Sequence, residues 1–412
     1  MNEAVDIHTV WTLLVGVAVI ASGFIEALFS RFQVPALVGY LLLGILLNIA
    51  DSYWSILTTP TRHAFTFLAD IGVIALLFQV GLKSHPGALA QKLPQAVKVW
   101  IGDVGGSALF GMVVSYFVLG LALIPSLIVA TALTATSVGV SVSSWQSRNA
   151  LDSDSGQLLV DVAELDDISA IALMALLFVL VPTLHTGHGD LFSALSTTAL
   201  VFIAKLVLFI AACYMFSRYA EQRFTEFTAK LEPAPQLMLT VVGVGFIIAA
   251  FANWLGFSLA VGALFAGLVF SRDPQAIKTS GSFQDIYAFV TPFFFINIGL
   301  HVSPGEIGAG SALGMVLLIA AVAGKFIGAG LPTLMISGVT SATLIGVSMI
   351  PRAEIAMIVM HEAQQLGKWA MPDKIYTAIV FVTIVTCIGA PLVLYRLLKL
   401  WPPPKADGRK ST

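Results

Sequence analysis

Long apolar blocks alternate along the chain with short polar connections that are rich in turn residues and charges. Many blocks approach the ~20 residues that a helix needs to cross ~30 Å of hydrocarbon. Dividing the chain at its breaker residues predicts about thirteen spans. Their limits are 9–30, 33–50, 65–83, 95–120, 123–145, 157–182, 192–216, 235–254, 256–271, 283–302, 312–336, 340–363 and 375–398. The pattern therefore predicts an all-α polytopic membrane protein with about 13 transmembrane helices.

The basic residues between the spans predict an orientation. One side would carry Arg31, Lys83, Lys92, Arg148, Arg218, Arg223, Lys230, Arg272, Lys278, Arg396, Lys399, Lys405, Arg409 and Lys410. The opposite side would carry only Arg62, Lys368 and Lys374. Cytoplasmic connections hold an excess of Lys and Arg. We therefore expect a multi-pass protein of the inner or plasma membrane with its N-terminus outside and its C-terminus in the cytoplasm.

Composition agrees with a bilayer environment. Apolar residues make up 58% of the 412 residues, charged residues make up 11%, and the mean hydropathy is +0.92. A soluble domain typically has about 25% charged residues. The net charge of −2 gives no information about nucleic acid, but the chain lacks a basic tract that could follow a phosphate backbone, so we expect no nucleic-acid partner. Membrane lipids are the expected surroundings.

Two spans contain residues that interrupt a helix. The middle of the fifth span, residues 131–139, is dominated by hydroxyl side chains and ends on a glycine. The twelfth span holds Pro351 between residues 349 and 354, and a proline disrupts the preceding helical turn. Each of these spans is followed closely by one more long helix. Spans two to six and nine to thirteen would then form two inverted five-helix repeats with crossing broken helices.

Four acidic residues lie inside the sixth span, where a charge costs about 2.5–3.5 kcal/mol. Neighbouring carboxylates repel, so at least one of Asp166 and Asp167 should hold a proton and release it to bind a hard cation. We predict these two as the ion-binding carboxylates. Asp161 and Glu164 lie nearer the cytoplasmic end and are expected at the entrance. The alternative is an interfacial helix whose true span begins near Ile168.

Oxygen atoms and a counter-charge could complete the site. The hydroxyls of Thr134, Thr136 and Ser137, with carbonyls freed by the break, would supply ligands. Lys325 lies at the middle of the eleventh span and is expected to pair with one of the carboxylates. The alternative is a lysine that extends to the membrane interface.

The remaining charges receive simpler interpretations. Arg352 and Glu354 flank the break of the twelfth span, and we expect them to neutralise each other and the ends of the half-helices. Asp70 and Asp103 are interpreted either as pathway residues or as hydrated helix ends. The small residues of Gly102–Gly106 suggest close helix packing.

No enzymatic motif is complete. His361-Glu362 lacks the second histidine of a zincin, and Gly324-Lys325 lacks the upstream glycine of a phosphate loop. Both cysteines, Cys213 and Cys387, fall in apolar segments and are expected to pack there. We predict no enzyme activity and no cofactor.

Several segments together resemble the sodium/proton exchangers of the bacterial cation:proton antiporter-2 family. They are residues 34–35, 39–44, 133–139, 165–168, 293–300, 324–325 and 351–354, in the expected order. The resemblance implies an NhaA-type fold and a homodimer that works by an elevator movement. It assigns residues 1–92 and 235–305 to scaffold and dimerisation helices, 93–190 and 306–400 to the ion-transporting core, 191–234 to a linker, and 401–412 to a cytoplasmic tail.

The resemblance also suggests roles for single residues. Asp167 matches the family's essential ion-binding aspartate, Asp166 its variable neighbour, and Lys325 the lysine that pairs with the site. An aspartate pair with a lysine resembles the electrogenic branch. The expected function is Na+ (or Li+)/H+ exchange by alternating access. K+/H+ exchange is the alternative, a cation channel is a further one, and a membrane enzyme is the remotest.

Overall fold

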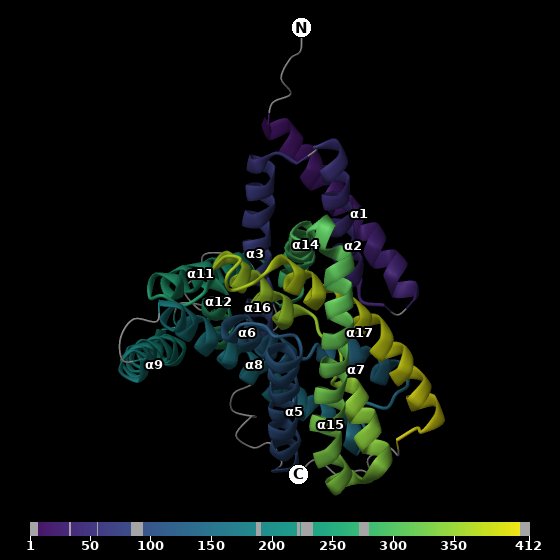
Figure 1. The fold of residues 1–412 in the computed structure, drawn as a ribbon. Coiled ribbons are helices and arrows are strands. Elements are labelled where there is room, and N and C mark those ends of the chain that lie inside the picture. The colour runs from purple at the N-terminus through teal and green to yellow at the C-terminus, as the bar shows by residue number, and fades with distance from the viewer. Residues whose placement is uncertain are drawn as a thin grey trace. The chain divides into compact units, whose positions relative to one another are not determined.

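The fold is all-helical throughout the residues that the computed structural model describes (Figure 1). These residues are 7–32, 34–55, 57–83, 94–186, 191–220, 223, 234–271 and 280–403. Nine helices among them are long and apolar enough to cross a membrane, which confirms the predicted class. The basic residues Lys92, Lys230, Arg272, Lys278, Lys405, Arg409 and Lys410, used above for orientation, lie outside the described residues.

The chain divides into two compact units. The first contains residues 1–32, 39–85 and 187–304, and the second contains 33–38, 86–186 and 305–412. Each unit is therefore built from segments that are far apart in the sequence.

The first unit is a bundle of apolar helices held by close backbone contacts. Its helices are α1 (Ile7–Arg31), α2 (Ala36–Trp54, from Gly39 on), α3 (Thr59–Lys83), α9 (Leu191–Met215), α11 (Ala234–Trp254), α12 (Leu259–Phe270) and α14 (Ser280–Leu300). Gly44 of α2 lies against Gly299 of α14, and Gly81 of α3 lies against Gly267 of α12. A methyl group at any of these four glycines would collide with the facing backbone. Small residues thus set the helix spacing here.

Helix α9, which falls in the predicted linker, clusters with the first unit. Phe209 of α9 packs against Phe257 and Phe265, with ring centroids 5.7 and 5.5 Å apart. Lys205 donates a hydrogen bond to the carbonyl of Leu255. This bond connects α9 to the residue that follows α11.

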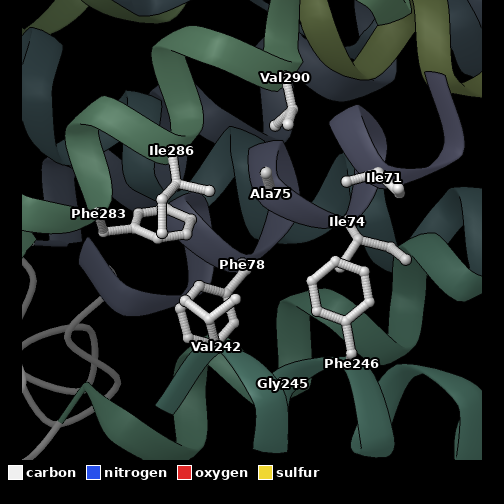
Figure 2. Close-up of a pocket in the computed structure, with 10 residues that line it drawn as sticks. All are labelled: Ile71, Ile74, Ala75, Phe78, Val242, Gly245, Phe246, Phe283, Ile286 and Val290. Carbon is white, nitrogen blue, oxygen red and sulfur yellow. The ribbon is translucent and has the colours of Figure 1, made fainter. Parts of the chain in front are cut away.

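Figure 2 shows an apolar pocket between α3, α11 and α14 of the first unit. Its lining consists of Ile71, Ile74, Ala75, Phe78, Val242, Gly245, Phe246, Phe283, Ile286 and Val290. No side chain in this lining is charged, so the pocket offers no ligand to a cation or proton.

The second unit contains the predicted breaks. Its helices are α5 (Pro94–Met112) with the π-helical turn Val113–Val118, α6 (Leu123–Thr134), α7 (Val138–Ser147), α8 (Asp154–Thr186), α15 (Ile307–Ser348), α16 (Glu354–Gln365) and α17 (Asp373–Leu400). Helix α15 runs through two predicted spans and kinks between them at Gly338, whose φ of 80° suits glycine. The helical path stops at 135–137 and again at 349–353, inside the fifth and twelfth predicted spans.

Candidate ion-binding site

The two interrupted segments of the second unit are bonded directly to each other. The backbone N–H of Ser137 donates to the carbonyl of Pro351 at 2.9 Å. Ser141 donates its hydroxyl to the carbonyl of Ser348, and the Trp145 indole donates to the Ser348 hydroxyl. Backbone groups that lose their helical partners at a break must find others in an apolar environment. The Ser137–Pro351 bond supplies such a partner, and the two breaks therefore lie side by side within the second unit.

Asp166 of α8 lies at this meeting point and is 0% exposed. Its Oδ2 accepts a hydrogen bond of 3.0 Å from the backbone N–H of Thr136, inside the first break. Its Oδ1 accepts a hydrogen bond of 3.1 Å from Nζ of Lys325. Both oxygens of this carboxylate therefore have a donor, one from a break and one from α15.

Lys325 has a second and shorter ion pair that the sequence did not predict. Its Nζ lies 2.5 Å from Oδ2 of Asp103 on α5, and Asp103 and Lys325 are both 0% exposed. This burial excludes the interpretation of Asp103 as a hydrated helix end, and its interpretation as a pathway residue stays a prediction. A lysine that extends to the interface is excluded as well, because the ammonium is buried between two carboxylates.

Close packing of α5 on α15 explains how this pair forms. The carbonyl of Gly102 lies against Gly328, and the carbonyl of Gly324 lies against Gly106. Glycines before and after Asp103 thus meet glycines on both sides of Lys325, and the two backbones can approach closely. The suggested packing role of Gly102–Gly106 is confirmed. This motif was the one sequence signal that could have connected Asp103 to Lys325.

Asp167 differs from its neighbour in both exposure and bonding. It is half-buried, and its carboxylate makes no hydrogen bond or salt bridge to any described residue. Successive helical residues point ~100° apart, so Asp166 and Asp167 face different surroundings. Asp166, Glu354 and Glu164 repel a negative charge on Asp167, whereas Lys325 attracts it. A cation or proton would relieve this repulsion.

The three predicted hydroxyl ligands have different partners. Thr134 donates to the carbonyl of Thr131 at 2.7 Å, within its own helix. Ser137 donates to Oε2 of Glu354 at 2.7 Å, across the two breaks. The Thr136 hydroxyl is buried and has no partner among the described residues. A buried polar group without a partner is costly, and a bound cation would satisfy this oxygen.

Arg352 does not neutralise Glu354, in contrast to the prediction. Its guanidinium is 0% exposed and donates to the carbonyls of Met349 and Ile350 at 2.9 Å each, and to that of Ala321 at 3.3 Å. Arg352 therefore caps the carbonyl end of the half-helix before the break, where positive charge is favourable. Glu354 begins α16 and bonds Ser137 instead.

Glu164, one of the two acidic residues predicted at the entrance, is half-buried on α8 one turn before Asp167. It adds negative charge near that carboxylate. Within the described residues, no group of three or more His, Cys, Asp or Glu side chains could hold a metal ion. The available ligands are carboxylate and hydroxyl oxygens, which suit a hard cation carried as substrate.

An all-helical membrane protein with two bonded helix breaks, buried carboxylates and a buried lysine has the architecture of an ion transporter. The chain belongs to the sodium/hydrogen exchanger family, because residues 15–400 match the model of transmembrane sodium/hydrogen exchangers. It is a cation/proton antiporter and not an enzyme.

Matches to known relatives cover most of the chain. It is 26% identical to the high-affinity Na+/H+ antiporter NhaS3 of Synechocystis sp., over 80% of this chain and 70% of that protein. It is 25% identical to the Na+/H+-K+ antiporter GerN of Bacillus cereus, over 88% of this chain and 90% of that protein. The solved sodium proton antiporter MjNhaP1 of Methanocaldococcus jannaschii has the same fold, with a TM-score of 0.66 and 13% identity over 95% of this chain and 97% of that one.

Proposed function

We propose that the protein exchanges Na+ or Li+ for H+ at the carboxylates of Asp166 and Asp167. The observation that carries this proposal is the half-buried, unbonded carboxylate of Asp167 beside the buried and fully bonded Asp166. Oxygens of Thr134, Thr136 and Ser137 at the first break would complete the ligand shell. Glu164 would attract cations to the entrance, and Glu354 and Arg352 would hold the breaks in place.

Competition for the same oxygens would couple the two ions. A proton on Asp167 removes the charge that attracts the cation, and a bound cation removes the charge that attracts the proton. Asp166 joins the exchange when it releases Lys325. Two carboxylates that serve one monovalent cation would make the exchange electrogenic. Because protons compete for the site, transport should rise with pH.

Alternating access would follow from movement of one unit relative to the other. The division of the chain into two compact units, each built from separate segments, supports separate core and scaffold elements. We propose that residues 93–190 and 306–400 carry the ion, and that residues 1–92 and 235–305 form the scaffold of a homodimer. The N-terminus would face outside and the C-terminus the cytoplasm.

Proteoliposomes containing a pH dye test the ion site directly. The Asp167→Asn variant should abolish cation-induced proton movement, because an amide neither exchanges protons nor binds a cation as a carboxylate does. Asp373→Asn is a matched control, since Asp373 pairs with Lys368, whose side chain is 82% exposed. Full activity in Asp167→Asn, with the control also active, would refute the proposed site.

K+/H+ exchange is a second candidate, because the name of the relative GerN includes K+ as well as Na+. The same vesicles challenged in turn with Na+, Li+ and K+ separate the two. Proton movement driven by K+ and absent with Na+ would favour this alternative. Rapid cation flux without proton movement would instead favour a channel.

A further inference from the structure

The ammonium of Lys325 is shared between carboxylates on two different helices. Nζ lies 2.5 Å from Asp103 Oδ2 on α5 and 3.1 Å from Asp166 Oδ1 on α8. An ammonium has three donors, so it can serve both carboxylates at once. Asp103 retains a spare acceptor, because its Oδ1 is buried without a partner among the described residues.

The two carboxylates are bonded differently. Asp166 bonds Lys325 through one oxygen and the Thr136 N–H through the other, so a cation or proton arriving there must displace a donor. If Lys325 had no other partner, this displacement would leave a buried unpaired ammonium, which is strongly unfavourable. Asp103 provides the second partner.

We infer that Asp103 is a positioning residue that retains Lys325 while Asp166 exchanges its proton or cation. Lys325 would bond both carboxylates when Asp166 is ionised and Asp103 alone when Asp166 is occupied. This inference rests on the proposed function, and assigns a task in it to a residue outside the predicted site.

The charges around Lys325 are consistent with this task. Asp103, Asp166, Lys325 and Arg352 are all 0% exposed, and their two negative and two positive charges balance. Asp166 and Lys325 of this set also act on Asp167, which Glu164 of α8 and Glu354 of α16 repel as well. Helix α6, which also packs on α5, contributes no titratable group in Leu123–Thr134.

The Asp103→Asn variant tests the inference in proteoliposomes. Without the second carboxylate, Lys325 would bond Asp166 alone and hold it ionised to lower pH. The pH of half-maximal exchange should move toward acid by about one unit, a tenfold change in proton concentration. At alkaline pH, where protons no longer compete, the KM for the driving cation should rise several-fold, because the cation must displace a more tightly held lysine.

Two variants separate this role from simple packing. Ser107→Ala removes a buried hydroxyl from the same helix, one turn further on, that has no partner among the described residues. It should keep the wild-type pH midpoint and KM. Asp103→Glu retains the carboxylate and should keep the wild-type midpoint even if its maximal rate falls. A structural defect would lower the rate without moving the midpoint.

A folded Asp103→Asn protein with the wild-type midpoint and KM would overturn the inference alone. Wild-type vesicles without any cation-driven proton movement would overturn the proposed function, and the inference with it. If Asp103→Asn does not fold, the same change is made in a Lys325→Gln background, and cation protection against thermal unfolding is followed over pH. Asp103 acts only through Lys325 in the proposed scheme. The Lys325→Gln variant and the Lys325→Gln, Asp103→Asn double variant should therefore have the same pH midpoint, and a different midpoint in the double variant would contradict the inference.

Discussion

Adjacent glycines on α5 allow a direct test of the packing that brings Asp103 to Lys325. A methyl group at Gly106 would lie 2.8 Å from the carbonyl oxygen of Gly324 and 2.9 Å from Cα of Gly328, on the facing α15. A methyl group at Gly105 would meet nothing within 4 Å. The Gly106→Ala substitution should push α5 from α15, whereas Gly105→Ala should leave the two helices in contact.

The expected magnitude comes from comparing the two variants. Replacing glycine by alanine inside a helix gains up to about 1 kcal/mol in helix propensity, and this gain is common to both. Overpacking against a fixed backbone costs about 1–3 kcal/mol and applies only to Gly106→Ala. Gly106→Ala should therefore be about 1–3 kcal/mol less stable than Gly105→Ala.

Denaturant unfolding of the purified protein in detergent measures this difference, and proteoliposome exchange measures its effect on transport. Gly106→Ala should also lose transport, because separating the helices lengthens the Asp103–Lys325 ion pair. Equal stabilities together with full transport in both variants would refute the close approach of α5 and α15 as the cause of that pair.

Three further substitutions test other contacts of the second unit. Thr136→Val should raise the KM for the driving cation several-fold and leave unfolding unchanged, because the lost hydroxyl has no protein partner; an unaltered KM would remove Thr136 from the ligand set. Arg352→Met should destabilise the protein by about 3–5 kcal/mol in thermal or denaturant unfolding, because it uncaps buried carbonyls, and a loss below about 1 kcal/mol would contradict that role. Ser141→Ala should lower the free energy of unfolding by about 1 kcal/mol, because it removes the bond to the Ser348 carbonyl. Ser143→Ala, on the exposed side of α7, should lower it less, and the reverse order would argue against the bonded breaks.

Local chemistry predicted much of the second unit. Hydroxyl residues in the fifth span and Pro351 in the twelfth marked interruptions that the structure has at 135–137 and 349–353. These predictions succeeded because a break depends on residues within about one helical turn. The inverted repeats and the number of spans depend on how whole segments are arranged, and they stay predictions.

The incorrect predictions concern charged residues whose ion-pair or hydrogen-bond partners lie on another helix. The depth of Asp103 along its span can be estimated from sequence, but the side of α5 that meets α15 cannot. Arg352 and Glu354 looked like partners because only one residue separates them. The non-helical Ala353, with φ −147° and ψ −105°, sends the two side chains to different neighbours. Sequence proximity is a poor guide to ion pairing wherever the backbone leaves the helix.

Exposure and charge together suggest a division of labour within the site. The four charged groups that are 0% exposed balance one another, so this buried set has no net charge that would draw in a cation. The half-buried carboxylates of Asp167, Glu164 and Glu354 carry the excess negative charge. Under the proposed function, an arriving cation would be attracted first to Asp167, whose carboxylate has no donor to lose. Asp166 would have to give up a lysine contact before taking part, so its occupation would be the later and more costly step of the proposed cycle.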